Sequence, residues 1–102
     1  MVVARLDNIV MELDELIEDL HKAYDDYSSK VKTYTEKKSK LWLYTDFNEV
    51  LGKGRPTVDE KKAYVSQQSL EEKMARDDAY YLIEYLKHKI DACHLKLKVY
   101  DE

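Results

Sequence analysis

The fold of this chain depends on residues 52–57, which read Gly-Lys-Gly-Arg-Pro-Thr. They contain both glycines and the only proline, and helical patterns run up to them from both sides. Gly52 can adopt the left-handed backbone that ends a helix, because it has no Cβ to clash. Pro56 cannot continue a helix, and Thr57 with Glu60 matches a capping box that starts the next one. The stretch therefore predicts a turn between two helical arms.

The first arm, residues 2–51, carries apolar residues that recur alternately three and four apart. The row at heptad positions a is Val3, Val10, Ile17, Tyr24 and Val31, and the row at d is Leu6, Leu13, Leu20, Tyr27, Tyr34 and Leu41. This repeat is typical of a coiled coil. A third row (Val2, Ile9, Leu16, Ala23) widens the apolar stripe, which favours a bundle of more than two helices. We expect a subunit interface formed by Val3, Leu6, Val10, Leu13, Ile17 and Leu20.

The second arm, residues 58–100, carries two adjacent apolar rows. The first is Met74, Tyr81, Tyr85, Ala92, Leu95 and Val99, and the second is Ala75, Ala79, Leu82, Leu86, Ile90, Cys93, Leu97 and Tyr100. One partner helix cannot cover both rows, so we expect this face to meet the first arm and a neighbouring subunit. Ser69 with Glu72 is another capping-box match, and residues 66–69 either interrupt the helix or lie within it. Ser28 and Ser29 are the place where the first arm is most easily loosened.

These patterns predict an all-α fold, a long antiparallel helical hairpin that resembles a coiled coil. Its 102 residues form one domain, with an arm at about 2–51, a turn at 52–57 and an arm at about 58–100. A two-helix hairpin of this size buries a thin core. We therefore expect it to assemble into a homo-oligomeric bundle.

Composition narrows the class of protein. The net charge of −4 argues against the general nucleic-acid coating that basic proteins provide. The single cysteine, Cys93, excludes an internal disulfide framework and suits a reducing compartment. The chain has no apolar run of about 18 residues and no signal-peptide pattern. We therefore expect a cytoplasmic protein with no membrane partner.

No catalytic or metal-binding pattern is evident. His88, Cys93 and His94 are the only soft ligands near one another, and their spacing does not let one helix direct all three at one ion. The pairs Asp25-Asp26 and Asp77-Asp78 are most simply solvated acids on a helix surface. A helical hydrolase with acidic clusters around a divalent metal would need Glu-x-x-His pairings on two helices, and the sequence has one, Glu18-Asp19-Leu20-His21. The sequence predicts a protein that is not an enzyme and has no metal and no cofactor.

Basic and aromatic residues gather around the turn. The candidate nucleic-acid-binding residues are Lys37, Lys38, Lys40, Trp42, Lys53, Arg55, Lys61 and Lys62, with Tyr44, Phe47 and Tyr64 interleaved. Cations that follow phosphates, together with rings that stack on bases, are what binding to single strands requires. The alternative is a solvated turn whose aromatics plug the end of the bundle.

Residues 52–63 carry a resemblance to a known family. The turn followed by Thr57-Val58-Asp59-Glu60-Lys61-Lys62-Ala63 is similar to small helical proteins of phage recombination and replication, and the layout resembles UvsY-type recombination mediators. The resemblance implies an oligomer that binds single-stranded DNA and helps to load a recombinase onto strands covered by single-strand-binding protein. The rival expectation is a coiled-coil interaction or structural adaptor, for phage assembly or regulation, without nucleic-acid binding.

Overall fold

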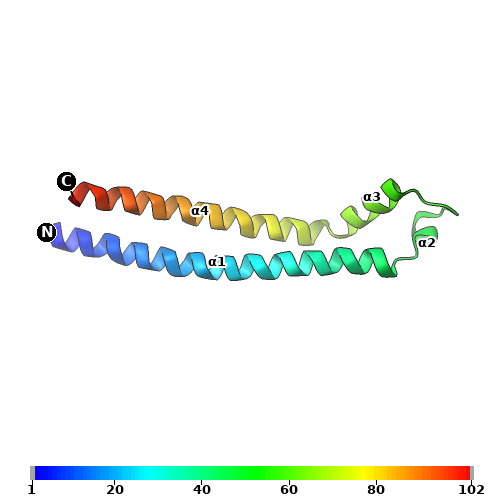
Figure 1. The fold of residues 1–102 in the computed structure, drawn as a ribbon, viewed down its shortest axis with the longest axis horizontal. Helices are drawn as coiled ribbons and strands as arrows, with labels where there is room; N and C mark the ends of the chain where they lie inside the picture. The colour runs from blue at the N-terminus through cyan, green and yellow to red at the C-terminus, as the bar shows by residue number, and fades with distance from the viewer. Residues whose placement is uncertain (1, 102) are drawn as a thin grey trace. The chain divides into compact units, whose positions relative to one another are not determined.

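The computed structural model describes residues 2–101, and the side chains of residues 4–100. Four helices follow in order: α1 (Val2–Tyr44), α2 (Phe47–Leu51), α3 (Val58–Gln68) and α4 (Leu70–Asp101), as Figure 1 shows. No strand occurs in residues 2–101. The predicted all-α class is therefore confirmed. None of the described helices combines the length and apolar character that crossing a membrane requires.

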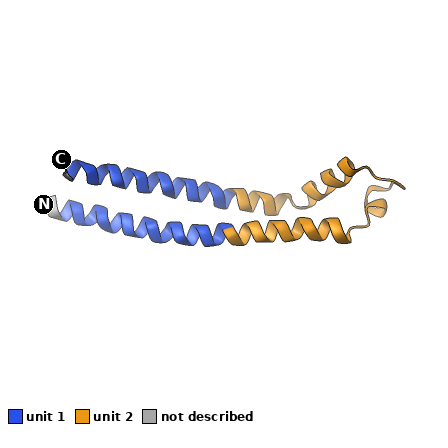
Figure 2. Cartoon of the chain, in the orientation of Figure 1, with its two compact units in different colours: residues 1–27, 78–102 blue, residues 28–77 orange. Residues whose placement is uncertain are grey.

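The chain divides into two compact units, coloured separately in Figure 2. Unit 1 comprises residues 1–27 and 78–102, and unit 2 comprises residues 28–77. Each unit contains one segment of α1 and one segment of α4, and unit 2 also contains α2 and α3. The prediction of a single domain stays a prediction.

Unit 1 is an antiparallel pair of helical segments. Glu12, early in α1, lies 3.8 Å from Lys96, late in α4, whereas Tyr27 contacts Tyr80, which comes earlier in α4. The core is a small cluster of buried residues, with half-buried neighbours packed on it: Ala23, Ile83 and Leu86, then Leu16, Leu20 and Tyr27. Such a short list of buried groups agrees with the thin core expected of a two-helix arrangement.

The side of α1 that faces α4 differs in one respect from a simple a/d seam. The d residues Leu6, Leu13 and Leu20 are half-buried, and so are Ile9 and Leu16 from the third row. By contrast, the a residues Val10 and Ile17 remain 42% and 38% exposed. The intramolecular seam therefore uses the d row and the third row. It leaves the a row at the edge of the seam, open to solvent in the single chain.

Unit 2 contains the reversal of the chain. Within it, the end of α1 pairs with the start of α4, where Lys37 lies 3.3 Å from Glu72 and Arg76 stacks over the Tyr34 ring at 4.7 Å. The pairs are again antiparallel, so the predicted fold-back is confirmed within this unit. The predicted homo-oligomer stays a prediction.

The helices of the first arm begin at Val2 and end at Leu51, within the predicted bounds, but the arm is not one continuous helix. Helix α1 ends at Tyr44, and the short helix α2 begins at Phe47. Asp46 makes this second start possible, because its carboxylate accepts a hydrogen bond from the Glu49 backbone N–H at 3.2 Å. At Ser28 and Ser29, where loosening was considered, α1 continues without a break.

The second arm is interrupted at Ser69, between α3 and α4. The helix restarts there, as one of the two alternatives had it, but the match of Ser69 with Glu72 does not form a capping box. The Ser69 hydroxyl is buried and donates to the Val65 carbonyl at 2.6 Å, instead of accepting from the first turn of α4. A serine that bonds back to the preceding turn bends a helix without ending its backbone ladder.

Candidate nucleic-acid interface

All eight residues predicted to contact nucleic acid fall in unit 2. Four lie on the last turns of α1, two in the loop and two on α3: Lys37, Lys38, Lys40 and Trp42; Lys53 and Arg55; Lys61 and Lys62. Unit 2 carries 11 Lys and Arg against 8 Asp and Glu, whereas unit 1 carries 6 against 13. Unit 2 is thus the positively charged part of an acidic chain.

The loop between α2 and α3 has the geometry that its residues predict. Gly52 ends α2 with φ 63° in the left-handed region, and its N–H bonds back to the helix. At the start of α3, Glu60 N–H donates to the Thr57 hydroxyl at 3.1 Å, and Thr57 N–H donates to the Glu60 carboxylate at 3.3 Å. The capping box is therefore confirmed.

Lys53 is used to close this loop. Its ammonium lies 2.8 Å from the Glu60 carboxylate. The hydrogen bond from Lys53, and then the one from the Thr57 backbone, hold the pKa of Glu60 below its ordinary value. A phosphate would have to compete with Glu60 for this lysine, so Lys53 is a weaker candidate contact than its position suggested.

Lys37 is also paired inside the chain. Its ammonium lies 3.3 Å from one carboxylate oxygen of Glu72. The residue's own backbone N–H, together with Lys37, holds the pKa of Glu72 below its ordinary value. The other oxygen, Oε2, is the buried side-chain oxygen that lacks a hydrogen-bond partner among the described residues. This ion pair ties α1 to α4 within unit 2.

The aromatic side chains near the loop mainly contact one another. Phe47 is buried, and its ring centre lies 5.6 Å from that of Trp42 and 6.0 Å from that of Tyr64. The Lys61 ammonium lies 5.5 Å from the centre of the same ring. Trp42 remains only partly exposed. For Phe47 and Tyr64 the plug interpretation describes the packing well, whereas Trp42, which is 37% exposed, keeps part of its surface open.

Tyr34 engages two further cations. Lys38 lies 5.2 Å and the Arg76 guanidinium 4.7 Å from the centre of its ring. Arg76 also donates to the Asp77 carboxylate at 2.9 Å. Cation–π contacts of this kind contribute about 0.5–1 kcal/mol at exposed sites. Lys38 is therefore already engaged with its own helix.

Three of the predicted cations keep their charge available. Lys40, Arg55 and Lys62 are exposed and form no ion pair or ring contact with any described side chain. Tyr44, one helical turn beyond Lys40, is 80% exposed. Tyr44 was not among the predicted contacts, although its spacing from Lys40 places both on one face of α1. That spacing was the signal that the sequence offered.

The predicted subunit-interface residues lie on α1 in unit 1. Leu6, Leu13 and Leu20 are half-buried in the seam with α4, and Val10 and Ile17 are exposed beside it. Val3 falls outside the described side chains. The d residues thus pack within the chain, and the exposed a residues are the ones that a partner helix can contact.

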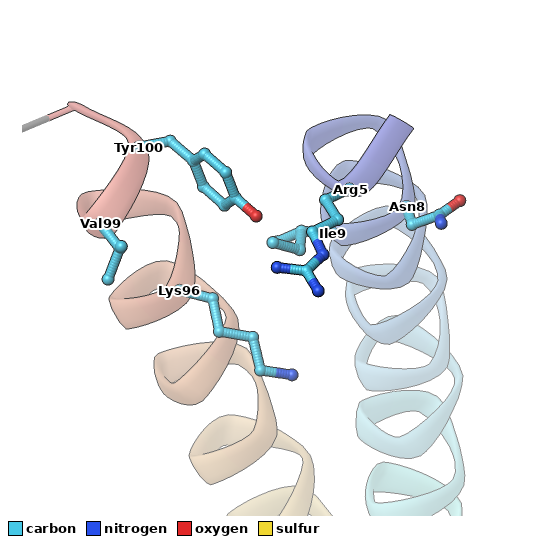
Figure 3. Close-up of a pocket in the computed structure, with 6 residues that line it drawn as sticks. All are labelled: Arg5, Asn8, Ile9, Lys96, Val99 and Tyr100. Atoms are coloured by element: carbon cyan, nitrogen blue, oxygen red, sulfur yellow. The ribbon is translucent and has the colours of Figure 1, made fainter. Parts of the chain in front are cut away.

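A separate cleft of about 400 Å³ lies in unit 1, at the ends of α1 and α4. Figure 3 shows the Arg5 guanidinium and the Tyr100 hydroxyl extending into the space between the two helices, with Lys96 below them. Asn8, Ile9 and Val99 complete the lining. The cleft is open and contains none of the predicted contact residues.

The described residues contain no group of three or more His, Cys, Asp or Glu side chains arranged to hold a metal ion. Cys93 is buried in the seam, whereas His88 and His94 are exposed. Comparisons with models of protein families, with curated proteins and with solved structures find no match for this chain. The resemblance to recombination mediators therefore stays a prediction from the sequence.

Proposed function

We propose that this chain is a non-enzymatic accessory protein of DNA recombination or replication, which binds single-stranded DNA through unit 2. The observation that carries the proposal is the face of α1 where exposed Lys40 lies one turn from Tyr44, the most exposed aromatic side chain that the structure describes. A cation that neutralises a phosphate beside a ring that stacks on a base is the usual basis of sequence-independent binding.

Two further features support this proposal. Unit 2 has a net positive charge although the whole chain is acidic, which confines attraction for phosphates to one part of the protein. Arg55 and Lys62 add exposed cations from the loop and from α3. Help in loading a recombinase, with a recombinase or a single-strand-binding protein as partner, is proposed on the resemblance alone.

The test is fluorescence anisotropy with labelled oligo-dT over a range of salt concentrations. We expect binding that weakens as salt rises, because phosphate contacts release counterions. Tyr44→Ala should weaken binding about 5- to 100-fold, given about 1–3 kcal/mol for one stacked base. Lys40→Gln should lower the slope against log salt by about one, the effect of a lost phosphate contact.

Lys22→Gln is the control, since it removes another exposed lysine from α1, in the acidic unit, where Lys22 lies 3.5 Å from Glu18. It should leave the affinity and the salt slope close to those of the unmodified chain. Absence of binding to oligo-dT at low salt would exclude the proposal. Equal effects of Lys40→Gln and Lys22→Gln would remove this face of α1 from it.

The second candidate is a coiled-coil interaction or structural adaptor without nucleic-acid contact. The exposed a row of α1, with Val10, Ile17 and Tyr24, favours it, because a regular apolar row beside a seam is suited to another helix. This candidate predicts no binding to oligo-dT at any salt concentration. It also predicts a protein partner that binds the unmodified chain and does not bind Ile17→Lys. The measurement uses the purified partner and the purified chain.

A further inference from the structure

The outer face of α4 carries a second apolar row that the intramolecular seam does not use. Within unit 1 the row is Tyr81, Tyr85, Ala92, Leu95 and Val99, with the polar His88 at one position, and its members are spaced alternately four and three apart. All six are exposed, and Tyr81, Tyr85, Leu95 and Val99 are between 56% and 71% exposed. With 3.6 residues per turn, this row lies on the side of α4 opposite Ile83, Leu86 and Cys93, which face α1.

We infer that this row is a coiled-coil seam at which α4 pairs in parallel with α4 of a second copy of the chain. The spacing assigns Tyr81, His88 and Leu95 to heptad positions d, and Tyr85, Ala92 and Val99 to positions a. In the last heptad, Leu95 at d and the β-branched Val99 at a are the combination that favours two parallel strands. The inference is independent of the proposed binding of DNA.

The charged residues beside the row indicate that a second copy of the chain binds there, and that the two α4 helices run in the same direction. Glu84, Asp91 and Lys98 lie at positions g, and Leu82, Lys89 and Lys96 lie at positions e. In a parallel pair, each g position meets the e position five residues later on the other strand. Glu84 would then meet Lys89 of the second copy, and Asp91 would meet Lys96. The two-fold symmetry repeats both pairs.

An antiparallel pair would be opposed by the same residues. There, e positions face e positions, so Lys89 and Lys96 of one copy meet the lysine-bearing edge of the other. Like charges across a seam disfavour that arrangement. In the antiparallel pair only Lys98, at g, meets an acidic g residue, whereas the parallel pair gives both acidic g residues a lysine partner. The charges therefore favour two copies in parallel.

Glu84, Lys89 and Lys96 each have a contact within the chain, and that of Lys89 is with the ring of Tyr85, whose centre lies 5.5 Å from the ammonium. Glu84 lies 3.5 Å from Lys87, and Lys96 lies 3.8 Å from Glu12, in each case with both side chains more than a third exposed. An ammonium has three donors and a carboxylate about four acceptor sites, so each group can take a second partner. Helix α1 packs on the opposite side of α4 and does not cover the row.

Sedimentation equilibrium on the full chain tests the inference. The unmodified chain should form a dimer, and Leu95→Lys should raise its dissociation constant by about a hundredfold, because one leucine from each copy leaves the seam. Met11→Lys is the control, since Met11 is equally exposed but lies on α1. Circular dichroism confirms that each variant is folded. A monomeric chain, or dissociation by Met11→Lys or Ile17→Lys but not by Leu95→Lys, overturns the inference.

Two charge variants test the parallel direction. Glu84→Lys and Lys89→Glu should each weaken the homodimer, because each places like charges across the seam. An equimolar mixture of the two should dimerise again, since every g–e′ pair is then opposite in charge. Oxidation of a Val99→Cys variant should also link two chains at a shared a layer. Failure of the mixture to restore the dimer, or of Val99→Cys to cross-link, contradicts the parallel seam.

Discussion

At the scale of single residues, the left-handed backbone angle of Gly52 ends helix α2 at the point where the chain reverses direction. Its φ of 63° lies where residues with a Cβ are strained, and an added Cβ would meet no atom within 4 Å. Any loss of stability when Gly52 is substituted therefore comes from backbone strain, and not from a clash between the new side chain and its surroundings. Gly54, two residues on, has no such angle and equally open surroundings.

Gly52→Ala should lower the free energy of unfolding by about 1–2 kcal/mol, the usual penalty for placing a Cβ in the left-handed region. Urea denaturation followed by circular dichroism measures this. Gly54→Ala, the control, should be neutral or slightly stabilising, because it reduces the entropy of the unfolded chain. Equal losses for both variants would show that the left-handed angle is not the cause.

Glu60 and Glu72 make the stability of unit 2 depend on pH. Both carboxyls have a pKa held below the ordinary value of 4.5 in the folded chain. A lowered folded pKa contributes stability that is present above the unfolded pKa and is lost as the pH falls through the folded pKa. The urea concentration at the midpoint of unfolding should therefore decrease as the pH is lowered below 4.5. The decrease should be smaller in Glu60→Gln. Glu36→Gln controls for the loss of one exposed charge, and a profile like that of Glu60→Gln would contradict this assignment.

At the scale of elements, the short helix α3 is held in place mainly by one buried side chain, that of Val65. Val65 is almost completely buried, whereas Val58 in the first turn of the same helix is 60% exposed. Burial of apolar groups is what holds such a helix, because 11 residues are too few for a stable isolated helix. Helix α4 is built differently, with one face on α1 and another facing solvent.

Val65→Ala should therefore cost about 1.5–3 kcal/mol, from the lost methyl groups and the cavity that they leave. Val58→Ala removes the same atoms from an exposed site and should change stability by less than about 0.5 kcal/mol. Thermal denaturation of the two variants measures the difference. Similar midpoints would mean that α3 is not anchored through Val65.

At the scale of the whole molecule, the two proposed activities lie in different units. The cations and Tyr44 that would contact DNA belong to unit 2, and the α4 row that would pair two copies belongs to unit 1. Unit 1 carries most of the acidic residues, which repel phosphates. Assembly and binding should therefore be separable by mutation.

Tyr44→Ala should weaken binding to oligo-dT and leave the dimerisation constant unchanged. Leu95→Lys should weaken dimerisation and leave the affinity of a single protomer for oligo-dT unchanged. That affinity is measured at protein concentrations below the dissociation constant of the dimer, so that avidity does not contribute. Anisotropy and sedimentation on the same samples provide both readouts. If either variant changed both quantities in a folded protein, the assignment of one activity to each unit would be wrong.

Much of this fold was predictable, because its signals are local. The left-handed cap at Gly52, the capping box of Thr57 and Glu60, and the heptad rows each depend on residues a few positions apart. The break before Phe47 was missed, since an Asp46 cap inside an apolar pattern is a weak signal beside a glycine and a proline. Ile83 was absent from the predicted rows, although it is at the centre of the core of unit 1.

The sequence by itself determined that the chain is helical, where it reverses, and that it has more apolar rows than one pair of helices can bury. Only the tertiary structure decided which rows face each other and which cations are already paired. The reason is physical: spacing along a helix defines its faces, but the partner of each face depends on contacts between residues distant in sequence. Lys53 and Lys40 look alike in the sequence, and only the contact with Glu60 distinguishes them.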